Sequence, residues 1–374
     1  MKEFSVPKLP LDDWIDTSIE YLTNNFAFLT KAISEYLKTG VEVIADGFKF
    51  QPLWIVILIF ALLIWQLVSR KKGFFIGTWS AILTTFGLGL LGHQELLSHE
   101  IITITVFIWL VLWQLAKYHL NILMILKVGL FLILVGLFWY WQLWHGNIMM
   151  ITFFTLIAWQ LAGRNVGIFT FVSFVFFWNL QLWEPTIDTL TLVLLATITA
   201  VTIGIPLGII AALSQKFYKI IMPILDFMQT MPAFVYLIPA IPFFGIGKVS
   251  AIFTTVVFAM PPAIRFTCLG IKQVQPELIE AANAFGSTTY QKLFKLQLPI
   301  AIPTIMAGIN QTIMLALSMV VIAAMIGAKG LGGEVWTAIQ RLEAGRGFQA
   351  GIAIVILAMI LDRISQKIGK NNQF

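Results

Sequence analysis

The sequence predicts an all-α integral membrane protein with about eleven transmembrane helices. Of its 374 residues, 59% are hydrophobic and 11% are charged, whereas soluble domains contain about 45–50% apolar and about 25% charged residues. The apolar residues gather in long segments without Asp, Glu, Lys or Arg, and a spanning helix needs about 20 such residues. These segments are too long for barrel strands and lack their alternation. The composition therefore excludes a soluble globular protein, a disordered chain and a nucleic-acid-binding protein.

The expected spans follow one another from residue 51 to residue 364. Two of them contain several prolines, and we expect these two to be interrupted because proline has no N–H to donate. Carbonyls freed in this way are tolerated in a membrane where they line a cavity or are buried in protein. The prolines are Pro223, Pro232, Pro239 and Pro242 in one span, and Pro261 and Pro262 in the next. The spans are placed near residues 51–69, 74–92, 101–116, 121–143, 148–162, 166–183, 187–212, 222–243, 249–268, 302–326 and 348–364.

Residues 1–49 form an N-terminal segment before the first span. Leu11, Trp14, Ile15, Ile19 and Leu22 recur at helical spacing, with acidic residues between them. This pattern predicts an amphipathic helix that lies on the periplasmic surface of the membrane. The alternative is a tethered helix that only anchors the chain.

Residues 50–185 are predicted to be three copies of a two-helix membrane hairpin. A Trp-Gln pair begins at residues 65, 113 and 159, and each pair ends an apolar run that is followed by a short polar or basic stretch. Such self-similarity at a nearly fixed period indicates an internal repeat. The alternative is coincidence within an apolar sequence of low diversity.

The distribution of basic residues predicts the orientation in the membrane. With the N-terminus outside and the C-terminus in the cytoplasm, 15 Lys and Arg residues beyond the N-terminal segment lie inside and 4 lie outside. Cytoplasmic loops carry the excess of Lys and Arg. The opposite orientation would invert this ratio.

A helix–turn–helix is predicted in the cytoplasmic loop at residues 271–300. Pro276 suits the first turn of a helix, and the acidic residues after it favour a helix N-terminus through the helix dipole. Gly286 is expected to end this helix as a cap. A second helix is expected from about Ser287 to Gln297, with its end at Leu298-Pro299.

This loop resembles the EAA loop of ABC importer permeases. The resemblance is carried by Glu280-Ala281-Ala282, Gly286 and Leu298-Pro299. In that family the loop supplies the coupling helix that docks in a cleft of the ATP-binding subunit, so these six residues are the ATPase-coupling candidates. Residues 229–239, 258–265, 306–322 and 352–363 are similar to the glycine betaine/proline betaine (ProW-type) permeases of osmoprotectant uptake systems.

The resemblance implies a type I ABC importer permease core at residues 186–368. Such a permease couples ATPase closure to alternating access for a compatible solute such as glycine betaine or proline betaine, and it is not an enzyme. The implied partners are an ATP-binding ABC subunit, a periplasmic substrate-binding protein and a second permease copy, in the bacterial inner membrane. Since the sequence has no Gly-x-x-x-x-Gly-Lys-Ser/Thr loop, ATP hydrolysis is expected on a separate subunit. The family would carry one hairpin, so two of the three are additional.

Polar and aromatic residues on the interrupted spans are candidates for a substrate pathway. A betaine carries a quaternary ammonium group, which binds to aromatic faces, and a carboxylate, which accepts hydrogen bonds. The alternative role of such residues is helix–helix packing. The candidates are Gln229, Phe234, Tyr236 and Asn310, whereas Asp226 and Arg265 are expected to form a structural pair.

The glycine-rich loop on the outer side is a candidate contact for the binding protein. It is predicted to contain a short amphipathic helix from about Glu334 to Leu342. Its charged residues Lys329, Glu334, Arg341 and Arg346 could meet the partner. The alternative is a solvated loop.

The alternative function is a secondary transporter of a small zwitterion driven by an ion gradient. It would need intramembrane acids or helix breaks that coordinate ions, and the predicted spans contain almost no acids. His93, His99, His119 and His145 fall in or beside loops on different sides of the membrane, and Cys268 is the single cysteine. No metal site and no cofactor are therefore expected.

Overall fold

The computed structural model describes residues 11–49 and 146–371, and every regular element in these two ranges is a helix. Four helices there are long and apolar enough to cross a membrane, and a fifth span results if one bent helix pair is counted as a single crossing. The prediction of an all-helical membrane protein is therefore confirmed. The four spans predicted between residues 51 and 143 lie outside the described residues. The chain divides into two compact units, residues 1–45 with 184–374 and residues 46–183.

In the second unit the structure describes one two-helix hairpin. Its helices are α7 (Gly146–Ala162) and α8 (Arg164–Asn179), close to the predicted ranges 148–162 and 166–183. The ring of Phe154 stacks on that of Phe174 with 4.9 Å between centroids. A Cβ added at Gly167 would lie 2.7 Å from the Cβ of Trp159, so this glycine permits the close approach of the two helices. The other two predicted copies lie outside the described residues.

The first unit begins with two helices where the sequence analysis expected one. Helix α1 (Leu11–Asn25) contains the predicted apolar positions, and α2 (Ala27–Lys49) follows it directly. Tyr21, Phe28 and Tyr36 are exposed on these helices. Helix α2 packs against α9 (Trp183–Leu213), since a Cβ added at Gly40 would lie 2.9 Å from Cδ1 of Leu195.

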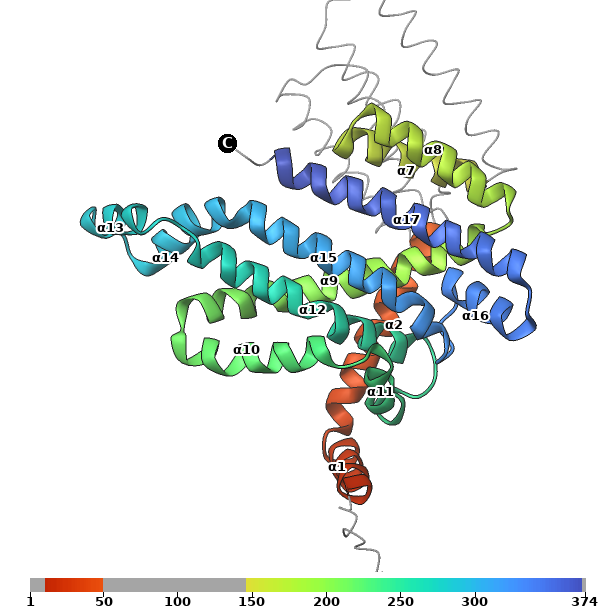
Figure 1. The fold of residues 1–374 in the computed structure, drawn as a ribbon, viewed down its shortest axis with the longest axis horizontal. Coiled ribbons are helices and arrows are strands. Elements are labelled where there is room, and N and C mark those ends of the chain that lie inside the picture. The colour runs from red at the N-terminus through yellow and green to blue at the C-terminus, as the bar shows by residue number, and fades with distance from the viewer. Residues whose placement is uncertain (1–10, 50–145, 372–374) are drawn as a thin grey trace, which may run out of the picture. The chain divides into compact units, whose positions relative to one another are not determined.

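The centre of this unit is the contact between α12 (Lys248–Lys272) and α15 (Leu298–Ala324), which run side by side (Figure 1). Gly308 of α15 lies against Phe266 of α12, and Gly270 of α12 lies against Ala301 of α15. Small residues let helices approach closely where lipid supplies no hydrophobic driving force. The short helix α16 (Leu331–Arg341) and the long helix α17 (Ala344–Asn371) pack together and against α15.

The span predicted at 222–243 is broken, as expected from its prolines. Helix α10 (Gln215–Thr230) stops at Met231, and the chain bends by 111° into a 3-10 turn (Ala233–Tyr236) and α11 (Leu237–Phe244). Met231 has an extended backbone because the residue before a proline, here Pro232, avoids the helical conformation. Pro223 and Pro242 lie inside helices, so they do not interrupt the chain.

The interruption predicted at Pro261 and Pro262 is wrong. Helix α12 continues through both prolines, which are buried. Burial in protein is one of the settings in which carbonyls freed by proline are tolerated at membrane depth.

We predict that Gly308→Ala destabilises the protein, because a Cβ at this position of α15 would lie 2.6 Å from the Cβ of Phe266 on α12. Overpacking of this kind costs about 1–3 kcal/mol. Gly351→Ala on α17 is the matched control, since nothing lies within 4 Å of an added Cβ there. Alanine has a more favourable helix propensity than glycine by up to about 1 kcal/mol, so we expect Gly351→Ala not to destabilise the protein. The measurement is the midpoint of thermal unfolding in detergent, and a midpoint for Gly308→Ala at or above that of wild type would contradict the packing argument.

Candidate functional site

The predicted cytoplasmic loop contains a short helix with well-defined ends. Helix α13 (Pro276–Ala284) has its proline in the first turn, as predicted. At the other end the Gly286 N–H donates to the Asn283 carbonyl, and the Ser287 N–H donates to the Ala282 carbonyl. These two bonds form a Schellman motif. Gly286 has φ +73°, the left-handed conformation that glycine adopts without strain.

The segment after Gly286 is held to α13 by side-chain hydrogen bonds. Thr288 and Gln291 form a reciprocal capping box at the start of α14 (Thr289–Lys292). The ammonium group of Lys292 donates to Oδ1 of Asn283 at 2.8 Å. Capping boxes satisfy two otherwise unpaired backbone donors. The loop is therefore an ordered helix–turn–helix.

The second helix of the loop does not end at Leu298-Pro299, where the sequence analysis placed its end. A π-helical turn at Leu293–Gln297 joins α14 to α15, so that one helical segment runs from Thr289 to Ala324 over 36 residues. The Leu298 N–H donates to the Leu293 carbonyl, five residues earlier. Because Pro299 has no N–H and its ring would clash with a carbonyl four residues before it, the wider turn admits the proline without a break.

The surface of this loop is exposed and partly apolar. No residue of α13 is buried. Phe285 is 90% exposed and Tyr290 is 70% exposed, and the carboxylate of Glu280 makes no ion pair within the described part of the chain. Large apolar side chains exposed beside an acidic group are typical of a protein-binding surface. Of the other predicted coupling residues, Ala281 and Pro299 are exposed, and Ala282 and Leu298 are half-buried.

Three of the four predicted pathway residues lie at the break between α10 and α11. Gln229 is exposed in the last turn of α10, and Phe234 is 53% exposed in the 3-10 turn. Tyr236 is buried, and its hydroxyl donates to the carbonyl of Met228 at the end of α10. Its ring packs edge to face on Phe258, with 5.7 Å between centroids. The fourth candidate, Asn310, is not part of this group.

Asn310 belongs to a polar cluster that connects α15 to α17. Its Nδ2 donates to Oδ1 of Asp362 at 2.9 Å, and its Oδ1 accepts from the hydroxyl of Ser365. Gln366 donates to both carboxylate oxygens of Asp362 at 2.9 Å. The sequence analysis missed Asp362, although it lies in the span predicted at 348–364. An acid inside an apolar span is the signal that would have found it.

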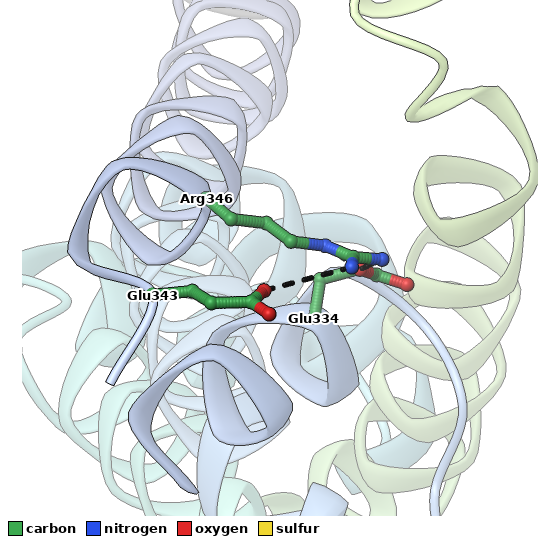
Figure 2. Close-up of polar contacts among 3 residues, drawn as sticks. All are labelled: Glu334, Glu343 and Arg346. Atoms are coloured by element: carbon green, nitrogen blue, oxygen red, sulfur yellow. Dashed lines mark hydrogen bonds and ion pairs between the residues drawn. The ribbon is translucent and has the colours of Figure 1, made fainter. Parts of the chain in front are cut away.

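In the loop predicted to face outward, the structure brings together two of the four predicted binding-protein contacts. Arg346 pairs with Glu334 at 2.9 Å and with Glu343 at 3.7 Å, as Figure 2 shows. Helix α16, predicted from about Glu334 to Leu342, runs from Leu331 to Arg341. Lys329 and Arg341 are exposed, and neither joins an ion pair among residues 146–371.

Two further ion pairs connect helix ends. Arg265 of α12 pairs with Asp226 of α10, which confirms the structural pairing expected for these residues. Lys248 at the start of α12 lies 3.7 Å from Asp188 near the start of α9. No group of three or more His, Cys, Asp or Glu side chains that could hold a metal ion occurs within the residues that the structure describes.

Comparison with known proteins gives consistent matches. Residues 204–371 match the family described as "Binding-protein-dependent transport system inner membrane component". The chain is 55% identical over 222 residues to the glycine betaine transport system permease protein OpuAB of Bacillus subtilis (strain 168), covering 59% of this chain and 79% of that protein. It is 60% identical over 210 residues to the glycine betaine/carnitine transport permease protein GbuB of Listeria monocytogenes serotype 1/2a (strain 10403S), covering 56% of this chain and 74% of that protein. It is 52% identical over 220 residues to the glycine betaine/proline betaine transport system permease protein ProW of Escherichia coli (strain K12), covering 59% and 62%.

We predict that Tyr236→Phe destabilises the protein, because it removes the hydroxyl that satisfies the Met228 carbonyl at the helix break. A buried acceptor left without a donor costs about 1–3 kcal/mol. Tyr290→Phe is the matched control, since Tyr290 is 70% exposed. Heating in detergent followed by size-exclusion chromatography gives both midpoints, and equal midpoints would show that the hydroxyl does not support the break.

Proposed function

The chain belongs to the family of inner membrane components of binding-protein-dependent transport systems, and from this membership we propose that it carries a compatible solute such as glycine betaine or proline betaine through the membrane. It is a permease subunit and not an enzyme, because ATP hydrolysis in this family lies on a separate ATP-binding subunit. The observation that carries the substrate class is the identity of 51–60% to glycine betaine permeases of the same family.

We propose the finer architecture on the same basis. The chain would cross the membrane about eleven times, with residues 1–49 outside, three hairpins at 50–185, a type I permease core at 186–368 and the C-terminus in the cytoplasm. The turn between α9 and α10 lies at the same end of the bundle as α13, and α16 lies at the opposite end (Figure 1). This arrangement supports the orientation in which the loop at 271–300 faces the cytoplasm.

We propose that α13 and the turn after it form the coupling element that docks on the ATP-binding subunit. Glu280, Ala281, Ala282 and Gly286 would make the contact, and Leu298-Pro299 would join it to the span. The support comes from the loop's exposed apolar side chains, its internal hydrogen bonds and its helical connection to α15. A rigid element transmits a push from a partner, whereas a flexible loop would absorb it.

The other partners are proposed from the family as well. A periplasmic substrate-binding protein would dock on the outer side. Lys329 and Arg341 carry charges there that take part in no ion pair of the described chain. Glu334 and Arg346 would contribute through their ion pair, which together with Glu343 leaves one net negative charge at this surface. A second copy of the permease would complete the transporter.

For the pathway, we propose Gln229 and Phe234 as direct substrate contacts, because both are exposed at the helix break. Tyr236 would support this break through its hydrogen bond to Met228. Asn310 forms hydrogen bonds to α17, and we propose that it supports the structure beside the pathway without contacting the substrate.

The transport function predicts ATP-dependent uptake. The chain and its cognate ATP-binding subunit are reconstituted in proteoliposomes that are loaded with ATP. We expect these proteoliposomes to accumulate radiolabelled glycine betaine when the binding protein is added outside. Unlabelled proline betaine is expected to compete, and choline, carnitine and trimethylamine N-oxide are tested in parallel to define the substrate range. Uptake driven by a Na⁺ or proton gradient without ATP would contradict the proposal and favour the secondary transporter.

The coupling role predicts loss of uptake from surface variants that fold normally. We expect Glu280→Ala to reduce betaine uptake at least about tenfold, since a lost contact at the centre of an interface costs about 2 kcal/mol or more. Gly286→Ala adds a methyl group to the exposed turn, and we expect it to reduce uptake because the added group hinders the close approach of the ATP-binding subunit. Glu277→Ala, on the same helix, controls for Glu280. Gly245→Ala controls for Gly286, because both glycines have φ +73° and open space around an added Cβ. Co-purification of the ATP-binding subunit is the second readout, and normal uptake by both variants would refute the coupling role.

A further inference from the structure

The carboxylate of Asp362 is held by neutral donors in a candidate membrane span. It accepts hydrogen bonds from Asn310 and from Gln366, each at 2.9 Å. No ion pair to Asp362 occurs in the described ranges 11–49 and 146–371. Acidic residues within membrane spans are costly and are retained mainly for function. The Asp362 cluster is therefore not explained by packing alone.

Asn310 is the only member of this cluster that lies on α15. Its amide uses both of its polar atoms, because Nδ2 donates to Asp362 while Oδ1 accepts from the buried hydroxyl of Ser365. These two hydrogen bonds fix the orientation of the amide and connect it to two positions on α17. A charge-assisted hydrogen bond is stronger than a neutral one and has a defined direction, so it opposes movement of one helix along the other.

We propose that the Asn310–Asp362 bridge positions α17 so that it moves together with the coupling loop. Helix α15 is continuous with α14 of that loop, so a displacement applied by the ATP-binding subunit travels along it to Asn310. The bridge then transfers the displacement to α17, whose first turn carries Arg346 of the outer cluster. Asp362 and Asn310 are thus positioning residues, and this inference rests on the proposed coupling function.

The test measures the ratio of betaine transported to ATP hydrolysed in the reconstituted complex. Asn310→Asp places two carboxylates opposite each other, and we expect it to lower this ratio at least about fivefold while ATP hydrolysis continues. Asp362→Asn keeps an acceptor for Nδ2 of Asn310 but loses the charge, so we expect a smaller decrease. The exchanged pair, Asn310→Asp with Asp362→Asn, restores a carboxylate opposite an amide. We expect it to return the ratio to within about twofold of wild type, as a double-mutant cycle reveals direct coupling.

Two milder variants keep the proposal testable if a single variant folds poorly. Ser365→Ala removes only the hydroxyl that holds Oδ1 of Asn310, and it is expected to give a smaller decrease of the ratio. Ser318→Ala is the control, because Ser318 on α15 donates to the Met314 carbonyl of its own helix. The proposal is overturned if the single variants keep the wild-type ratio, or if the exchanged pair stays as uncoupled as they are. Absence of uptake by the wild-type complex would instead refute the proposed function.

Discussion

Lipid offers no hydrogen bonds to a peptide backbone, and side-chain hydroxyl groups meet this constraint at three irregular points of the chain that the structure describes. At the helix break the hydroxyl of Tyr236 supplies a donor to the Met228 carbonyl, and after α11 the hydroxyl of Ser250 does the same for Gly245. At the start of α16 the Leu331 N–H donates to the hydroxyl of Thr189 on α9. At these three points a side-chain hydroxyl group forms a hydrogen bond with a backbone group at a helix end or break.

Much of the helical architecture could be predicted from the sequence because apolar runs of spanning length have few alternatives in a membrane. The end of α13 at Gly286 was also predictable, since a glycine after a helical run is a common cap. The π turn was not predictable, because it arises from how a whole helix accommodates Pro299. The uninterrupted course through Pro261 and Pro262 depends on burial among neighbouring helices, which one sequence does not reveal. Asp362 was overlooked because it lies at the edge of an apolar run.

The two ends of the permease core use charge in opposite ways. At the end that carries α16, Arg346 is paired with Glu334 and Glu343, so its formal charge overstates what a partner would meet. At the other end, Glu280 and the ring of Phe285 point to no partner in the described chain, although the loop that carries them is well ordered. An ordered surface with unused binding groups supports the proposal that another protein covers it.

The continuous helical segment from Thr289 to Ala324 has a mechanical consequence. Its 36 residues rise about 54 Å at 1.5 Å per residue, whereas the hydrocarbon layer is about 30 Å thick. Part of the helix therefore extends beyond the lipid, where another protein can reach it. Because the segment is continuous, a displacement of the end beyond the lipid also moves the part of the helix that lies within it.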